Sequence, residues 1–343
     1  MKKVILTVKE TTTGNNAGPK AKLDIEKFLV KDGFIKWNFE IDQHSLLQKA
    51  KTAYLNVPSF LKKHSAVDEI FLQYPTYSRI VTRQLVKRIS QMDTKLFLII
   101  HDVESLRLHL NEKDYIKEEL NTFNKTDGLI VHNDQMKKWL INNGISVPII
   151  TLGIFDYASD VKLSDRNSSQ YPSVCFAGNL NKAKFLGNLS FKKVQLDVFG
   201  PNPLDEYGTN VSYKGQYSPD ELPKYLDENF GLVWDGSTPH TCDGLFGNYM
   251  RFNDPHKASL YLSSGIPVII WKEAALAAFI EKNNIGLSVS DLNDMDEVLS
   301  ELSPEKYQQM VMNAQLIAKK LRNGFYIHQA VQKLETKVAN EGK

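Results

Sequence analysis

The chain has 343 residues, of which 42 are basic and 40 acidic, so its formal net charge is +2. This length suits roughly two domains of about 150 residues each. A hydrophobic content of 42% with 24% charged residues is ordinary for a globular protein. The near balance of charge, without a long Lys/Arg run, argues against nucleic acid as a partner. The two cysteines, Cys175 and Cys242, form no CxxC pattern, which argues against a disulfide scaffold or a structural zinc site and suits a reducing cytosol.

No segment of the sequence has the pattern of a membrane anchor. The first apolar run, Val4–Val8, breaks at Lys9-Glu10 and is too short for the core of a signal peptide. No apolar run approaches the roughly 20 residues needed to span a bilayer. We therefore expect a cytoplasmic protein, and leave open a peripheral position at the inner face of the membrane. Lys49–Lys51 and Lys62-Lys63 are too sparse along the sequence to decide that point.

The first half of the chain alternates short apolar runs with segments of helical periodicity. The predicted strands are Val4–Val8, Lys36–Ile41, Glu69–Tyr74, Leu96–Ile100, Leu129–His132 and Pro148–Leu152. The predicted helices between them are Ala21–Val30, Arg79–Met92, Asp114–Phe123 and Gln135–Asn142. Leu96–Ile100 is apolar at every position, as expected for a parallel strand that helices cover on both faces.

A polar segment, Ser159–Tyr171, interrupts this alternation and resembles an interdomain connection. The strands then predicted are Ser173–Phe176, Gln195–Phe199, Val211–Tyr213, Gly231–Trp234, Val268–Trp271 and Leu287–Val289. Four further helices are predicted. One begins at Ser218, and the others cover Ala274–Lys282, Pro304–Leu321 and Ile327–Val338. Repeated βα units indicate an α/β protein with two Rossmann-like domains that face each other across a cleft. We place the domains at residues 1–158 and 172–320, and expect a C-terminal helix in residues 321–343 that crosses back to the first domain.

The most informative stretch is residues 230–270. A buried strand, Phe230–Trp234, leads into a polar loop, and Asp254-Pro255 then opens a short helix as its N-cap and first residue. Gly265 is expected to end that helix in a left-handed conformation. A helix N-terminus at the carboxyl edge of a parallel sheet favours a phosphate, and His256 and Lys257 in its first turn add a cation. The sequence therefore predicts a diphosphate site here.

Four strings in this order resemble a known family: IIHDVESL (99–106), FAGNLNKAKF (176–185), FGLVWDG (230–236) and HKASLYLSSGIPVII (256–270). They are similar to bacterial GT-B glycosyltransferases that include the streptococcal glucosyltransferase 3 enzymes and β-1,6-galactofuranosyltransferases. The resemblance implies a GT-B fold, a UDP-sugar donor in the C-terminal domain, an acceptor held mainly by the N-terminal domain, and a homo-oligomer, either dimer or tetramer. It favours glucose transfer to a GlcNAc-modified serine-rich repeat glycoprotein, with galactofuranose transfer to a polysaccharide precursor as the alternative.

Candidate donor-binding residues follow from these strings. Lys257 is expected to offset the charge of the departing UDP, with His256 beside it. Gly178 and Asn179 follow a strand end, and Lys182 or Lys184 stands where the family commonly has an arginine. Tyr217 is a candidate for stacking on uridine, and Asp235 for a sugar hydroxyl. Each also has a structural alternative, as a turn, packing or solvated residue.

In the first domain, His101-Asp102 directly follows a buried strand. An inverting transferase needs a base to take the proton of the acceptor hydroxyl. Asp102 is the first candidate, with His101 and Glu104 as rivals; helix capping is the alternative role for Asp102. Gly14, Asn15 and Asn16, in the first βα turn, are candidates for acceptor binding. This turn lacks GxGxxG, which argues against a nicotinamide-dependent oxidoreductase.

We expect no metal ion and no other cofactor. The sequence has a single D-x-D, Asp294–Asp296, at a predicted helix start, where acidic residues are common for structural reasons. The resemblance implies that Lys257 and the helix N-terminus take the place that a metal ion has in other transferases. A non-catalytic partner of the same fold, which binds an acceptor or activates another transferase, is the competing hypothesis.

Overall fold

The computed structural model describes residues 1–10, 17–41, 45–64, 66–163 and 172–341. The chain forms two compact units: Met1–Leu152 with Tyr326–Lys343, and Gly153–Phe325. Gly14, Asn15 and Asn16 lie outside the described residues. None of the described helices is long and apolar enough to cross a membrane.

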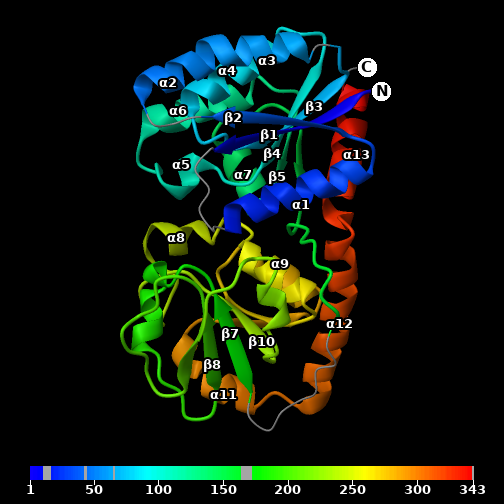
Figure 1. The fold of residues 1–343 in the computed structure, drawn as a ribbon. Coiled ribbons are helices and arrows are strands. Elements are labelled where there is room, and N and C mark those ends of the chain that lie inside the picture. The colour runs from blue at the N-terminus through cyan, green and yellow to red at the C-terminus, as the bar shows by residue number, and fades with distance from the viewer. Residues whose placement is uncertain (11–16, 42–44, 65, 164–171, 342–343) are drawn as a thin grey trace. The chain divides into compact units, whose positions relative to one another are not determined.

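The first unit is built on a six-stranded, all-parallel sheet with the order β2-β1-β3-β4-β5-β6 (Figure 1). Figure 1 shows helices on both sides of this sheet, with α2, α3 and α4 on one side and α1 on the other. The strands are β1 (Lys3–Glu10), β2 (Ile35–Ile41), β3 (Glu69–Tyr74), β4 (Lys95–Ile100), β5 (Gly128–Val131) and β6 (Ile149–Thr151). The helices are α1 (Ala17–Lys31), α2 (Leu46–Lys51), α3 (Val57–Lys63), α4 (Arg79–Ile89), α5 (Glu104–Arg107), α6 (Lys113–Phe123), α7 (Asp134–Asn142) and α13 (Phe325–Glu341), with a π-helical turn η1 (Thr52–Asn56) between α2 and α3.

The second unit repeats the design with a parallel sheet of order β12-β11-β10-β7-β8-β9. Its strands are β7 (Ser173–Ala177), β8 (Gln195–Phe199), β9 (Val211–Gly215), β10 (Phe230–Val233), β11 (Val268–Trp271) and β12 (Gly286–Val289). Its helices are α8 (Gly244–Tyr249), α9 (His256–Ser263), α10 (Ala277–Lys282), α11 (Met295–Ser300) and α12 (Pro304–Arg322). Short 3-10 turns are η2 (Leu180–Lys182), η3 (Lys184–Asn188), η4 (Leu222–Lys224) and η5 (Leu292–Asp294). The predicted α/β class with two parallel sheets is confirmed.

One predicted helix and one predicted loop of the second unit have a different secondary structure from the one expected. The helix expected from Ser218 is only the 3-10 turn η4, although Ser218 Oγ does bond Glu221 Oε2 at 2.8 Å. Pro223 lies inside η4 and lacks the N–H that a continuing helix needs. The polar loop expected between Trp234 and Asp254 contains α8. Asp243 stands at its N-cap and accepts hydrogen bonds from Ser237 N and Oγ, and these bonds lower the pKa of the Asp243 carboxyl.

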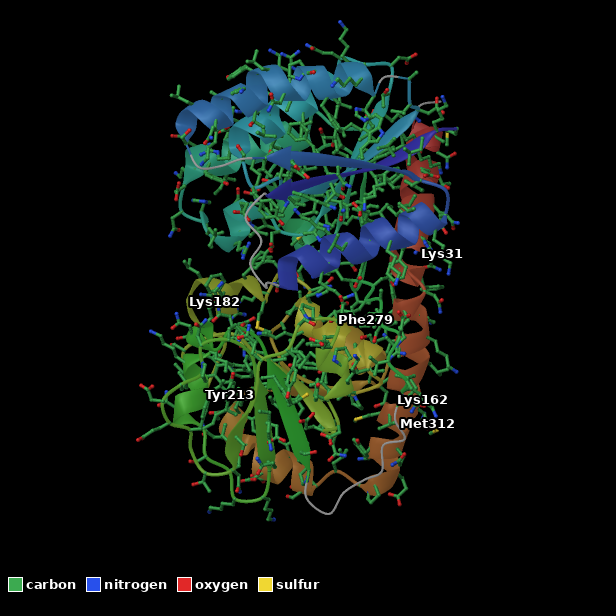
Figure 2. The ribbon with its side chains drawn as sticks, viewed as in Figure 1. Lys31, Lys162, Lys182, Tyr213, Phe279 and Met312 are labelled. Carbon is green, nitrogen blue, oxygen red and sulfur yellow. The ribbon has the colours of Figure 1, made fainter. Side chains whose placement is uncertain are left out.

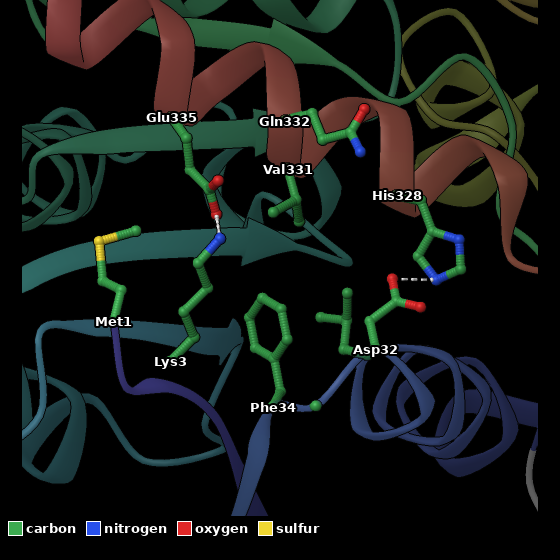
Figure 3. Close-up of a pocket in the computed structure, with 10 residues that line it drawn as sticks. Met1, Lys3, Asp32, Phe34, His328, Val331, Gln332 and Glu335 are labelled. Carbon is green, nitrogen blue, oxygen red and sulfur yellow. Dashed lines mark hydrogen bonds and ion pairs between the residues drawn. The ribbon is translucent and has the colours of Figure 1, made fainter.

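A pocket lies at the amino edge of the first sheet, where β1 begins (Figure 3). Two side-chain contacts join α13 to the rest of this unit there. Lys3 Nζ forms an ion pair with Glu335 Oε1 at 2.6 Å, and His328 Nε2 lies 2.7 Å from Asp32 Oδ2. This pocket is at the opposite end of the strands from His101, which follows β4. The residues around this pocket attach α13 to the first unit, and the predicted catalytic residues His101 and Asp102 do not line it.

Candidate functional site

The carboxyl edge of the second sheet gathers three of the predicted donor residues. The neighbouring parallel strands β7 and β10 end at this edge, β7 just before Gly178 and β10 just before the Trp234-Asp235 pair. The loop after β10 returns to the sheet through α9, whose first turn carries Lys257. In an open parallel sheet this is the edge at which ligands bind.

Packing between α9 and the strands beneath it sets the position of the helix. The ring of Tyr261 lies directly over Gly231 in β10, where a Cβ would come 2.1 Å from the ring. The Tyr261 hydroxyl is fully buried and accepts a hydrogen bond from Ala177 N at 2.7 Å. A glycine in the strand therefore lets the helix approach closely, and the tyrosine ties it to the end of β7.

The two ends of α9 test the predicted caps. Gly265 has φ +72°, and the bonds Ile266 N to Tyr261 O and Gly265 N to Leu262 O form a Schellman motif, as predicted. The predicted start at Asp254-Pro255 is wrong by one residue. Pro255 occupies the cap position with an extended ψ of 128°, and its carbonyl accepts the first bond of the helix, from Ala258 N.

Lys257 is held firmly at this edge. Its Nζ donates to Asp235 Oδ1 at 2.7 Å and to Trp234 O at 3.2 Å, and only 20% of its side chain is exposed. The ammonium also lies 4.7 Å from the centre of the Phe176 ring, a cation–π contact. Gly178 adjoins it so closely that a Cβ there would come 3.1 Å from Lys257 Cε. The structure thus places Gly178 and Asp235 next to the side chain of Lys257.

His256 precedes Lys257 but its ring packs against other aromatic groups. The ring centres of Tyr157 and Phe155 lie 5.1 Å and 6.2 Å from that of His256. Tyr157 in turn donates to Pro219 O at 2.8 Å. This packing holds the first turn of α9 against residues 155–157 of the same unit.

The segment after Gly178 forms two short 3-10 turns. Asn179 Oδ1 accepts from Asn181 N at 3.2 Å and from Asn202 Nδ2 at 3.1 Å, so this side chain shapes the turn. Lys182 lies beside α8, with its Nζ 4.3 Å from the centre of the Phe246 ring (Figure 2). Lys184 begins η3 and is exposed. Of the two lysines, Lys182 is the one that contacts the segment leading to α9.

Tyr217 lies farther along the chain, after β9. Its ring stacks on that of Tyr225, with ring centres 3.8 Å apart and planes 20° from parallel. Gly215, with φ +108°, lies beneath the Tyr217 ring. Tyr225 is 48% exposed, so the pair presents an open aromatic surface. Such a surface suits stacking on a flat base.

In the first unit, His101 follows β4 and Gln73 lies in the neighbouring strand β3. The buried Gln73 amide donates from Nε2 to Thr7 Oγ1 at 2.7 Å and to Lys22 O at 3.1 Å. Because a carbonyl oxygen only accepts, these bonds fix the amide orientation and leave Gln73 Oε1 facing His101 Nε2, 2.8 Å away. His101 Nε2 therefore carries a hydrogen, and in the neutral ring Nδ1 is the basic nitrogen.

A second histidine, His132, forms a hydrogen bond with the backbone of His101. His132 Nε2 donates to His101 O at 2.9 Å, and burial lowers the pKa of His132 to about 4. His132 is therefore neutral at neutral pH and acts as a fixed hydrogen-bond donor. Gln73 and His132 were not singled out from the sequence. Gln73 did leave a signal, because it is the one uncharged polar residue in the strand EIFLQY.

Asp102 has a charged partner of its own. Its Oδ2 accepts from Arg107 Nη1 at 3.0 Å, and Arg107 also reaches Glu104 Oε1 at 3.5 Å. The backbone N–H groups of Glu104 and Ser105 donate to the buried carboxylate of Glu119. Glu119 therefore caps the first turn of α5. Asp102, which precedes this helix, forms an ion pair with Arg107 at its last position.

The D-x-D pair has a structural role. Asp296 accepts hydrogen bonds from the backbone N–H groups of Lys192, Lys193 and Val194 at 2.7–2.9 Å, and the pKa of its carboxyl is lowered despite partial burial. Asp294 stands at the cap position of α11. Among the residues that the structure describes, no cluster of three or more His, Cys, Asp or Glu side chains is arranged to hold a metal ion.

The chain matches two family models in succession. Residues 2–154 match the glucosyltransferase 3-like N-terminal domain, and residues 174–334 match the glucosyltransferase 3-like C-terminal domain. The chain belongs to the glucosyltransferase 3-like family. This confirms the resemblance drawn from the four sequence strings.

Curated relatives of this glucosyltransferase 3-like chain carry two different activities in their names. It is 36% identical to the β-1,6-galactofuranosyltransferase WbbI of Escherichia coli (strain K12) over 241 residues, which are 69% of this chain and 70% of that protein. It is 29% identical to Glucosyltransferase 3 of Streptococcus gordonii over 262 residues, 76% of each chain. The chain is thus a glycosyltransferase by family.

Solved structures agree on the architecture. The sucrose-phosphate synthase of Thermosynechococcus elongatus superposes with a TM-score of 0.64 at 14% identity, covering 99% of this chain and 100% of that chain. The E. coli trehalose-6-phosphate structure bound with UDP-2-fluoro glucose gives 0.65 at 10% identity, covering 97% and 99%. These matches show the GT-B fold, as predicted.

Proposed function

We propose that this glycosyltransferase moves a hexose from a UDP-sugar to a glycan acceptor, with inversion and without a metal ion. The observation that carries the proposal is Lys257, a partly buried ammonium in the first turn of α9, held beside Gly178 at the carboxyl edge of the second sheet. Membership of the glucosyltransferase 3-like family supports it.

The donor diphosphate would lie at the N-terminus of α9. The N–H groups at the start of a helix point away from the helix body, and the helix dipole adds positive potential there, so this end of a helix favours an anion. Lys257 adds a full charge. When the bond from the anomeric carbon to the diphosphate breaks, negative charge grows on the leaving oxygen, and a cation already in position stabilises it without reorganisation. This is the task that a metal ion performs in other transferases.

His101 is the residue that we propose as the general base, in preference to Asp102. The base must accept the proton of the acceptor hydroxyl while that oxygen attacks the anomeric carbon. Asp102 is engaged with Arg107, whereas Gln73 fixes the tautomer of His101 so that Nδ1 is the basic atom. Gln73 thus acts as a positioning residue. It directs the basic nitrogen of His101.

The donor sugar is proposed from the relatives. The higher identity to the galactofuranosyltransferase, 36% against 29%, favours UDP-galactofuranose as the first donor to test. UDP-glucose, which the sequence strings favoured, is the second. The corresponding acceptors are a cell-surface polysaccharide precursor and a GlcNAc-modified serine-rich glycoprotein.

Calorimetry on the wild-type chain in the presence of EDTA tests the donor. The panel is UDP, UDP-galactofuranose, UDP-galactose, UDP-glucose, UDP-GlcNAc and NADH. We expect micromolar binding of UDP and of one UDP-hexose, and none of NADH. Absence of binding by every UDP compound would reject the transferase in favour of a non-catalytic partner of the same fold.

The base is tested by the pH dependence of transfer once the donor is known. His101→Asn should lower kcat by about 10²–10⁴-fold with little change in UDP affinity. Gln73→Glu places a carboxylate beside Nε2, which favours the imidazolium, so the acid limb of kcat/KM should move to higher pH. If Asp102→Asn abolishes turnover while His101→Asn retains it, the assignment is wrong.

A further inference from the structure

One helical rod on the first unit exposes an unusual combination of side chains. The rod consists of α2, η1 and α3, residues 46–63, and contacts α4 (Figure 1). Leu47, Tyr54 and Leu55 are 84%, 55% and 64% exposed on it. Single exposed apolar residues are normal on a protein surface. Three on one short rod require an explanation.

The inner side of the rod is firmly packed, so the exposed side chains stand on a fixed support. Thr52, Ala53, Val57 and Leu61 are buried. Phe60 packs its ring against Trp37 and Phe39 of β2, with ring centres 5.9 Å and 5.1 Å apart. The outward direction of the three apolar residues is therefore a property of the folded unit.

The same rod is basic throughout. Residues 45–64 contain Lys49, Lys51, Lys62 and Lys63 and not one aspartate or glutamate. Lys51, Lys62 and Lys63 are exposed together with the apolar residues. We name the exposed residues Leu47, Lys51, Tyr54, Leu55, Lys62 and Lys63 the basic-apolar face.

We propose that the basic-apolar face docks this enzyme onto an anionic lipid surface. Leucine and tyrosine side chains that project beside lysines match the boundary between headgroups and acyl chains, where the apolar groups insert and the cations meet lipid phosphates. A second copy of the chain fits less well. A self-complementary contact would bring the same four lysines of each copy together without any carboxylate from the rod to offset them.

Vesicle flotation of the full chain tests the proposal, and it needs neither donor nor acceptor. Vesicles of phosphatidylcholine alone are compared with vesicles that also contain phosphatidylserine, at low and at physiological salt. We expect binding to the anionic vesicles that weakens with salt. Leu47→Ser/Leu55→Ser should lower the partition coefficient by at least about tenfold. Lys51→Glu/Lys62→Glu should abolish the preference for phosphatidylserine.

A matched control comes from α12, where Leu316 is 58% exposed and Lys319 is also exposed. Leu316→Ser and Lys319→Glu should leave vesicle binding unchanged. Absence of wild-type binding, or binding that both double variants retain, overturns the proposal. One further outcome would also overturn it: the wild type does not bind vesicles, and Leu47→Ser/Leu55→Ser changes the oligomeric state. The basic-apolar face would then be an interface between two copies of the chain. Donor affinity measured on the same variants separates a failure here from a failure of the proposed function.

Discussion

Removal of the Lys257 ammonium should weaken UDP binding by more than the loss of one hydrogen bond. A charge-assisted bond to the diphosphate is worth about 1.5–3 kcal/mol, or roughly 10- to 150-fold in Kd. The ion pair with Asp235 offsets part of this in the free protein. Because both side chains are partly exposed, at 20% and 26%, that offset is at most about 1 kcal/mol.

Asp235 adds a second term that only the structure makes visible. In Lys257→Ala its carboxylate faces the incoming diphosphate without a counter-charge. Two unit charges about 5 Å apart repel by about 3 kcal/mol at an effective dielectric constant of 20, and solvent exposure reduces this to about 1–2 kcal/mol. The net loss is about 1.5–5 kcal/mol, so the variant should bind UDP roughly 10- to 5,000-fold more weakly than the wild type.

A double-mutant cycle measured by calorimetry separates the two terms. Asp235→Asn alone should change UDP affinity by at most about fivefold, which corresponds to the offset of about 1 kcal/mol, while in the Lys257→Ala background it should restore about tenfold. Lys282→Ala, which removes an exposed lysine from α10, is the control and should bind as the wild type does. UDP binding within about twofold of wild type in Lys257→Ala, or no recovery in the double variant, would refute this account of the site.

Three further predictions follow from the second unit. Gly178→Ala should weaken UDP binding by about 3- to 10-fold, because the added Cβ would press on Lys257 Cε at 3.1 Å, whereas Gly187→Ala meets its nearest neighbour at an ordinary 3.5 Å and should bind normally in the same titration. Tyr261→Phe leaves a buried backbone N–H of β7 without its acceptor, so urea denaturation should show a loss of about 1–3 kcal/mol, and an unchanged midpoint would contradict the role given to the hydroxyl. Burial raises the pKa of the Glu228 carboxyl from 4.5 to about 7, so the folded state keeps a proton that the unfolded chain releases, and stability falls as pH rises from 4.5 to about 7. The fall is measured as the difference in unfolding free energy between about pH 4.5 and pH 8, and in Glu228→Gln it should be smaller by about 2–3 kcal/mol. An equal fall in the variant and the wild type would contradict this prediction.

Local sequence patterns determined the architecture of this protein. Runs such as Leu96–Ile100 are short and apolar at every position, as strands covered on both faces are, so the strands could be predicted without the structure. The glycine that ends α9 was equally readable, because a left-handed residue there favours glycine. Lys257 could be selected as a candidate donor-binding residue because it lies in the first turn of a helix that follows a buried strand. Each of these features depends on residues that are close together in the sequence, so a local pattern is enough to predict it.

The pairings that give the candidate site its chemistry depend on tertiary structure. Lys257 and Asp235 lie 22 residues apart, Gln73 and His101 lie 28 apart, and Ala177 and Tyr261 lie 84 apart. Each contact depends on how whole strands and helices pack, so no local pattern indicates it. The rod at residues 46–63 shows the same limit. Its π-helical turn breaks the spacing of 3.6 residues, so its apolar residues show no simple helical period, and only the folded unit decides that Leu47, Tyr54 and Leu55 point outward.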